Sequence, residues 1–199
     1  MKILSAILVL LFTTSCIETV LISSAATGVM VVRDKPIPDA GKDIVISTKI
    51  GSSFLVNGLK NYGNSVDVTV NEGRVLLTGI VRDSQKAKLA AELCWNVKGV
   101  KEVIDEIQLR DNESVSAKDF LDTASDYSIT SQVEAKMLFD KKIATLNYQV
   151  TTVSKTVYFL GIAQSEAEKR RVLALAAKIR GVKKVVDHII LTNDDRRRK

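Results

Sequence analysis

The chain repeats itself, and this repeat constrains its fold more than any other feature of the sequence. Matching glycines lie 82 residues apart, since Gly79 corresponds to Gly161 and Gly99 to Gly181. The apolar positions around these glycines align at the same offset. Because one pattern of apolar positions specifies one packed unit, the repetition predicts two tandem domains with the same fold.

The first helix of each half is predicted from apolar residues spaced at i, i+4 and i+8, which lie on one face of a helix. We expect the two helices to begin after Asp43 and Asp126, because aspartate favours helix starts. The residues that form the pattern are Ile46, Ile50 and Phe54 in the first half and Ile129, Val133 and Met137 in the second.

A predicted hairpin follows each first helix. Residues 66–70, Val-Asp-Val-Thr-Val, alternate with the period of a strand. In the next three residues, Asn71-Glu72-Gly73, the glycine can supply the positive φ of a hairpin turn. The second half has Ser154-Lys155 at the corresponding turn, which is a poorer turn sequence.

A second helix then leads to a final strand in each half. Apolar residues at i, i+3, i+4 and i+7 are expected to face a core. Ser165 and Glu168 have the spacing of a capping box, and Gly99 and Gly181 end the helices by adopting the left-handed conformation. The predicted core residues are Ala90, Leu93, Cys94 and Val97 in the first half and Val172, Leu175, Ala176 and Ile179 in the second.

Each half therefore has the element order α-β-β-α-β. A helical crossover makes the second and third strands parallel, whereas the hairpin is antiparallel. We expect an α+β protein with two tandem domains, each a three-stranded mixed sheet packed on two helices. The predicted segments are a signal peptide 1–15, a lipidated cysteine and tether 16–42, a first domain 43–110, a linker 111–125, a second domain 126–192 and a basic tail 193–199.

The N-terminus resembles a bacterial lipoprotein signal. Lys2 precedes an apolar run of about ten residues, which is typical of an export signal and well short of the roughly 20 residues that span a bilayer. Residues 13–16, Thr-Thr-Ser-Cys, resemble a lipobox, in which the signal is cut before Cys16 and the thiol takes diacylglycerol. Thr13 replaces the usual leucine, so cleavage near Ala25 to give a soluble secreted protein stays an alternative.

Positive charge is concentrated in the second half of the chain. Residues 43–110 have a net charge of +1 and residues 126–192 a net charge of +5, within a total of +6. The terminal run 196–199, Arg-Arg-Arg-Lys, is expected to be a solvated, disordered end. Aromatic residues make up 5% of the chain, which leaves few stacking platforms for single-stranded nucleic acid.

Few residues are available for catalysis. His188 is the only histidine, and the chain lacks the partners that a zinc or nucleophile site needs beside it. Asp105 and Asp187 are related by the repeat, and we interpret them as structural residues that bond to local backbone. With Cys16 lipidated, Cys94 has no partner for a disulfide within the chain. The sequence predicts no enzyme activity, no cofactor and no metal site.

The repeat resembles the BON domain, a bacterial family named after osmotic-stress and nodulation proteins. Residues 75–79 with 99–103, and again 157–161 with 181–185, match its hairpin glycine and its closing Gly-Val strand. The layout is similar to the dual-BON outer-membrane lipoproteins of Gram-negative bacteria. This resemblance implies a protein anchored by lipid in the outer membrane and facing the periplasm, which binds anionic phospholipid and supports membrane integrity. A nucleic-acid partner conflicts with export.

In that family the first helix of the second domain binds the lipid, and in this chain that helix covers roughly residues 128–139. Glu134 departs from the family pattern, since a base would favour anionic lipid there. The alternatives are that the apolar residues of this helix form a core and that its lysines form a solvated face. The residues predicted to contact phospholipid are Tyr127, Ile129, Val133, Lys136, Met137, Lys141 and Lys142.

A different function stays open beside the lipid-binding one. The same two domains could serve as a periplasmic adaptor that recruits envelope-assembly or cell-wall proteins through a strand edge or the helix pair. Ile17 follows the predicted lipid cysteine, where aspartate would retain a lipoprotein in the inner membrane of enteric bacteria. The sequence therefore favours transport to the outer membrane.

Overall fold

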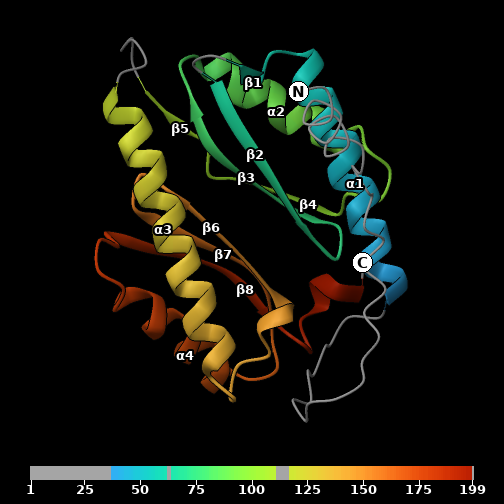
Figure 1. Cartoon of the computed structure of the whole chain (residues 1–199). Helices are drawn as coiled ribbons and strands as arrows, with labels where there is room; N and C mark the ends of the chain where they lie inside the picture. Colours follow the sequence, from blue (N-terminus) through green and yellow to red (C-terminus); the bar gives the residue numbers. More distant parts are fainter. Residues whose placement is uncertain (1–36, 62–63, 111–116, 199) are drawn as a thin grey trace, which may run out of the picture. The chain divides into compact units, whose positions relative to one another are not determined.

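The computed structural model describes residues 37–61, 64–110 and 117–198, and these form two domains of the predicted α+β fold (Figure 1). The predicted signal peptide, Cys16 and most of the predicted tether lie outside the described residues. Within the described part of the chain, no helix combines the length and the hydropathy that a membrane span requires.

The first domain contains a sheet packed against two helices. Strands β2 and β3 form an antiparallel hairpin, and β3 then pairs in parallel with both β4 and β5. Its elements are α1 (Ile37–Val56), β1 (Lys60–Asn61), β2 (Asn64–Asn71), β3 (Arg74–Val81), α2 (Ser84–Trp95), β4 (Glu102–Asp105) and β5 (Gln108–Leu109).

The second domain repeats this arrangement with an uninterrupted last strand. Strand β7 pairs antiparallel with β6 and parallel with β8, so the sheet is three-stranded and mixed as predicted. Its elements are α3 (Ala117–Phe139), the 3-10 turn η1 (Thr145–Asn147), β6 (Tyr148–Val153), β7 (Thr156–Ala163), α4 (Glu166–Ala177), β8 (Lys184–Leu191) and the 3-10 turn η2 (Asp195–Arg198).

The first sheet has five strands where the sequence predicts three. The predicted third strand is split into β4 and β5, because its pairing with β3 stops at Asp105 and resumes at Gln108. The two-residue strand β1 adds the fifth strand at the edge beside β2. The hairpin and the parallel crossover are as predicted.

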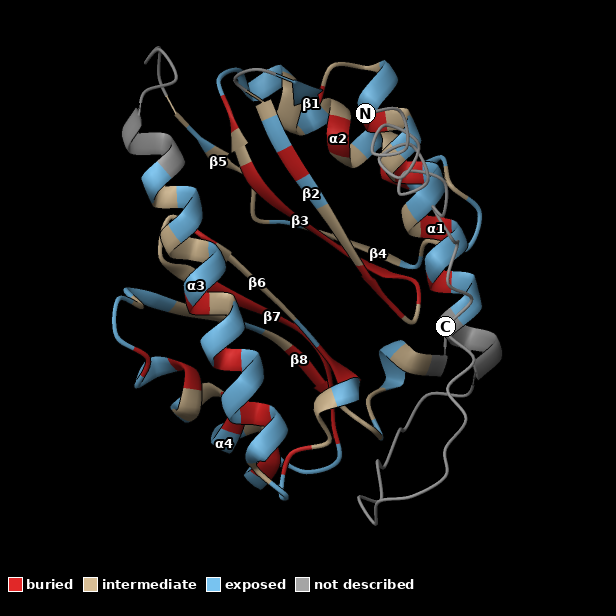
Figure 2. Ribbon diagram, viewed as in Figure 1, coloured by how far each residue is buried: buried red, intermediate tan, exposed pale blue. Residues whose placement is uncertain are grey.

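Each domain has its own core between its sheet and its two helices, and Figure 2 shows buried segments alternating with exposed ones along α1 and α3. The predicted helix pattern is confirmed, because its six residues are all buried. Cys94 is also a core residue, and burial together with the nearby Asp105 charge raises the pKa of its thiol to about 12. The six helix residues are Ile46, Ile50, Phe54, Ile129, Val133 and Met137.

The predicted helix starts are wrong. Helix α1 begins at Ile37 and α3 at Ala117, so parts of the predicted tether and linker are helical. Asp43 and Asp126 lie inside these helices, and each carboxylate accepts two backbone hydrogen bonds from a hairpin turn. The donors are Glu72 at 2.8 Å and Gly73 at 2.9 Å for Asp43, and Ser154 at 2.7 Å and Lys155 at 2.8 Å for Asp126. We call each of these pairs of bonds a carboxylate clamp.

The predicted helix ends are wrong by a few residues, and half of the capping box is present. Gly99 and Gly181 have the predicted left-handed φ, 103° and 96°, but α2 and α4 already end before them, with Asn96 and Lys178 as their C-caps. The Ser165 hydroxyl accepts a hydrogen bond from the Glu168 backbone, so Ser165 is the N-cap of α4. The Glu168 carboxylate accepts from the Gln164 backbone rather than from that of Ser165. Gly79 is required for close approach, since a Cβ there would lie 1.8 Å from the Ser65 carbonyl oxygen.

The two domains belong to one compact unit and share a small third core. Leu76 of β3 packs with Tyr158 and Leu160 of β7, on the sheet faces that point away from the helices. Arg74 is 2% exposed, and it donates to Glu102 at 2.6 Å and to the His188 carbonyl oxygen at 3.0 Å. The second face of each sheet is therefore covered by the other domain.

The basic tail is docked rather than solvated, which corrects the prediction for its described part. The Arg197 guanidinium donates to both carboxylate oxygens of Glu72, from Nε at 2.9 Å and from Nη2 at 3.0 Å. Arg197 also donates to the Thr192 carbonyl oxygen at 2.8 Å. The tail of the second domain is thus held against the hairpin turn of the first, and we call this contact the tail clasp.

Candidate membrane-docking surface

Helix α3 carries most of the predicted lipid contacts, and the structure separates them into two groups. Ile129, Val133 and Met137 are 2%, 0% and 1% exposed and belong to the core of the second domain. They leave no surface for a lipid, so we remove them from the candidate surface. Core packing was the alternative interpretation that the sequence allowed for them.

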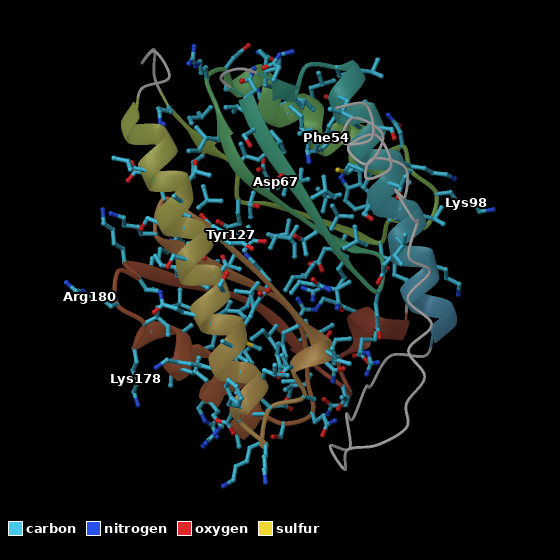
Figure 3. The ribbon with its side chains drawn as sticks, in the orientation of Figure 1. Phe54, Asp67, Lys98, Tyr127, Lys178 and Arg180 are labelled. Atoms are coloured by element: carbon cyan, nitrogen blue, oxygen red, sulfur yellow. The ribbon has the colours of Figure 1, made fainter. Side chains whose placement is uncertain are left out.

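The remaining predicted contacts are exposed. Tyr127 is 76% exposed on α3, where Figure 3 labels it. Lys136 is exposed on the same helix, and Lys141 and Lys142 are exposed just after its end at Phe139. The structure therefore leaves one aromatic residue and three cations available to a ligand.

Two strongly exposed apolar residues at the end of α3 were missed by the sequence analysis. Leu138 is 70% exposed and Phe139 is 84% exposed, and Leu146 of η1 is 52% exposed. The apolar spacing of the helix indicates their exposure, since Leu138 and Phe139 follow the core residue Met137 and so lie outside the buried i, i+4 stripe. We define the α3 tip as Leu138, Phe139, Lys141, Lys142 and Leu146.

The α3 tip is held in place by hydrogen bonds around Asp140. The Asp140 carboxylate accepts from the Lys142 backbone at 3.0 Å and forms an ion pair with Arg171 of α4. The hydrogen bond from Arg171 lowers the pKa of Asp140, with further contributions from the Lys142 backbone and from both cationic charges. The acid next to the tip is thus already paired inside the domain, which leaves the two lysines of the tip as its outward charges.

Below the tip, the chain is fixed to α4 by a second carboxylate. Glu168 is 7% exposed, and its two oxygens accept from the Ala144 backbone and the Gln164 backbone, both at 2.8 Å. Ile143, between the lysines and this bond, is 7% exposed and packs in the core. The turn that presents Lys141 and Lys142 is therefore anchored on both sides.

The positive charge of the second domain has another concentration, at the end of α4 beside the β6–β7 turn. The Lys183 backbone donates to the Lys155 carbonyl oxygen at 2.8 Å, which brings the end of α4 beside the β6–β7 turn. Lys178 and Arg180 are exposed there and extend away from the ribbon in Figure 3. The positive charge of this domain is thus divided between the α3 tip, which lies beside Arg171 of α4, and the residues that follow the end of α4.

Among the described residues, no group of three histidine, cysteine, aspartate or glutamate side chains could hold a metal ion. His188 lies 2.9 Å from a Glu106 oxygen of the first domain, a structural contact between domains. Asp105 and Asp187 each accept a 2.9 Å bond from backbone two residues ahead, as predicted.

Comparison with known proteins agrees with the two domains. The family described as "BON domain" matches residues 42–111 and 125–193. The chain is 36% identical over 156 residues to the "Uncharacterized protein in gshII 5'region" of Anaplasma centrale, which covers 78% of this chain and 99% of that protein.

Two further relatives have descriptive names. The chain is 35% identical over 123 residues to "Outer membrane lipoprotein DolP" of Haemophilus influenzae, which covers 61% of this chain and 60% of that protein. It is 29% identical over 143 residues to "Osmotically-inducible protein Y" of Escherichia coli K12, which covers 72% of this chain and 69% of that protein.

Proposed function

The chain belongs to the BON-domain family, with two BON domains in tandem, and from this premise we propose that it is a lipid-anchored envelope protein that docks on anionic phospholipid through its second domain. The relative named as an outer membrane lipoprotein and the lipobox-like residues before Cys16 support the anchor and the outer membrane as its location. Support of outer-membrane integrity is the cellular role that we assign to this docking.

The observation that carries the lipid-binding proposal is the α3 tip. It presents Leu138 and Phe139, and the cations Lys141 and Lys142 follow after Asp140, which is paired with Arg171. A membrane interface accepts this combination, because apolar side chains enter the acyl boundary while cations stay among the headgroups. Each cation contributes about 1 kcal/mol near an anionic surface, and each buried large apolar side chain roughly 1.5–3 kcal/mol.

Vesicle flotation tests the α3 tip. The protein would start at Ile17, which removes the predicted lipid cysteine and keeps both cores intact. We expect it to float with phosphatidylglycerol vesicles more than with phosphatidylcholine vesicles, and binding should weaken with added salt because screening acts within about 10 Å at 0.1 M. The double variant Leu138→Ser with Phe139→Ser should bind at least about a hundredfold more weakly.

The matched control removes exposed apolar surface elsewhere. Trp95 and Leu109 are 56% and 59% exposed in the first domain, so Trp95→Ser with Leu109→Ser makes a comparable change away from the tip. We expect this control to bind like the unmodified protein. Equal binding to anionic and neutral vesicles would refute the lipid proposal and leave the protein-binding adaptor as the better hypothesis.

The anchor proposal has its own test. Cells that express the full chain are grown with a clickable fatty acid, and the protein is isolated and coupled to a fluorophore. We expect label on the unmodified protein and none on Cys16→Ala, because the thiol of Cys16 starts the acylation. Label that persists in Cys16→Ala, or a mature protein that starts near Ala25, would contradict lipidation at this cysteine.

A further inference from the structure

The outward face of α1 is the most apolar helix face that the structure describes in the first domain. Four large apolar residues on it are exposed: Ile44 at 64%, Val45 at 51%, Leu55 at 63% and Val56 at 87%. Their spacing places them on two adjacent lines of one helix side, over a length of about 18 Å at 1.5 Å per residue. The buried residues of α1 alternate with this exposed side, as Figure 2 shows.

The hydroxyl groups on and beside this face already have hydrogen-bond partners within the helix. Ser47 and Thr48 donate to the Ile44 carbonyl oxygen at 3.0 and 2.8 Å, and Ser52 donates to the Thr48 carbonyl oxygen at 2.9 Å. Burying an unpaired hydroxyl is costly, whereas these can leave water with their bonds intact. These three hydroxyl groups therefore oppose the transfer of this face out of water only weakly.

The charge on this side of α1 has one sign. From Gly41 to Val56, all of which the structure describes, the exposed charged side chains are Lys42 and Lys49, and Lys42 also has an interaction within the protein. The outward charge of this helix side is therefore that of Lys49. The acid in this stretch, Asp43, is 7% exposed and is turned inward by its carboxylate clamp. The outward side of α3, in contrast, has the exposed acid Glu134.

We propose that the outward face of α1 is a second membrane-docking surface, which inserts its apolar residues into the interface of an anionic bilayer. We define this surface, the α1 face, as Ile44, Val45, Thr48, Lys49, Ser52, Leu55 and Val56. Apolar residues with the cation Lys49 and no exposed acid among them complement an anionic headgroup layer. A second copy of the chain is a poorer occupant, since two such faces would bring lysines together without a carboxylate to pair with them.

This inference goes beyond the proposed function, because it assigns lipid contact to the first domain independently of the α3 tip. Site-resolved NMR distinguishes the two surfaces. The protein that starts at Ile17 is mixed with vesicles of phosphatidylglycerol and phosphatidylcholine in equal parts, with a spin label on the lipid acyl chain near the headgroup. We expect paramagnetic broadening of amide signals between Ile44 and Val56, and the same broadening in the Leu138→Ser, Phe139→Ser variant.

A binding variant provides the second measurement. Ile44→Gln, Val45→Gln, Leu55→Gln and Val56→Gln replace exposed side chains with a good helix former, so α1 should keep its fold. We expect the apparent Kd for the same vesicles to rise at least about a hundredfold, since four apolar side chains no longer enter the interface. The control is Trp95→Ser with Leu109→Ser, which should leave the apparent Kd unchanged.

The possible results separate the two proposals. If the signals between Ile44 and Val56 broaden and those of the α3 tip do not, the proposed function is overturned and the α1 face is supported. Binding to vesicles without broadening between Ile44 and Val56, or an unchanged Kd in the glutamine variant, would overturn the α1 face. A dimer that the glutamine variant abolishes, measured by light scattering, would also overturn it, because the occupant would then be a second copy.

Discussion

At the scale of single residues, the two carboxylate clamps are the contacts with the clearest energetic consequence. Asp126 holds the backbone N–H groups of Ser154 and Lys155, which have φ values of 51° and 64°. Residues other than glycine adopt this region at a cost of about 1–2 kcal/mol each. Two charge-assisted hydrogen bonds from one carboxylate offset that cost and fix the turn.

We expect Asp126→Ala to lower the free energy of unfolding by about 2–4 kcal/mol, because two backbone donors lose a charged acceptor. The free energy of unfolding of Asp126→Asn should lie between those of the unmodified protein and Asp126→Ala, since an amide keeps one oxygen acceptor. Denaturant unfolding at neutral pH measures both.

The control for this prediction is Asp67→Ala. Asp67 forms a 3.3 Å ion pair with Lys60, with both side chains more than a third exposed, so its loss should cost less than about 1 kcal/mol. If Asp126→Ala destabilised the protein no more than Asp67→Ala does, the clamp would have no special role.

At the scale of elements, the sequence predicts which helix face packs but not where a helix begins. The stripes Ile46, Ile50, Phe54 and Ile129, Val133, Met137 are buried, since periodicity reports directly on the side that faces a core. The helix starts were missed because Asp43 and Asp126 look like N-cap residues. The clamp that they form depends on a hairpin about 30 residues away, and no local pattern reveals it.

The candidate site was predictable to a similar extent. The repeat and the charge difference identify the second domain, and the resemblance identifies its first helix. The family resemblance did not predict which side chains of this helix are exposed to a ligand. The residues that it indicated include Ile129 and Met137, which are buried, and leave out Leu138 and Phe139, which are exposed. The split of the charge between the α3 tip and the end of α4 depends on folding, because Lys155 and Lys183 are distant in sequence.

At the scale of the whole molecule, the tail clasp joins the last described residues to the first hairpin. Arg197 and Glu72 are side chains with 20% and 13% exposure, and their contact is a two-point fork. Such geometry makes an ion pair stronger than a single exposed contact. The clasp should therefore contribute to holding the domains together.

A double-mutant cycle tests the tail clasp. We expect Arg197→Ala and Glu72→Ala each to lower the free energy of unfolding by about 1–2 kcal/mol, with a coupling energy of roughly 1 kcal/mol in the double variant. The coupling should decrease with added salt. Arg170→Ala is the control, since its 3.9 Å pair with Glu166 is on the helix surface and should be worth less than about 0.5 kcal/mol. A coupling energy near zero would contradict the clasp.

The shared third core has a consequence for the history of the chain. Leu76 in one sheet and Tyr158 and Leu160 in the other are 1%, 3% and 0% exposed because the two copies cover each other. A lone ancestral copy with such a face would have needed a companion molecule to keep it from water. Fusing two copies into one gene supplies that companion at a fixed ratio, so either half cut from the other is expected to self-associate.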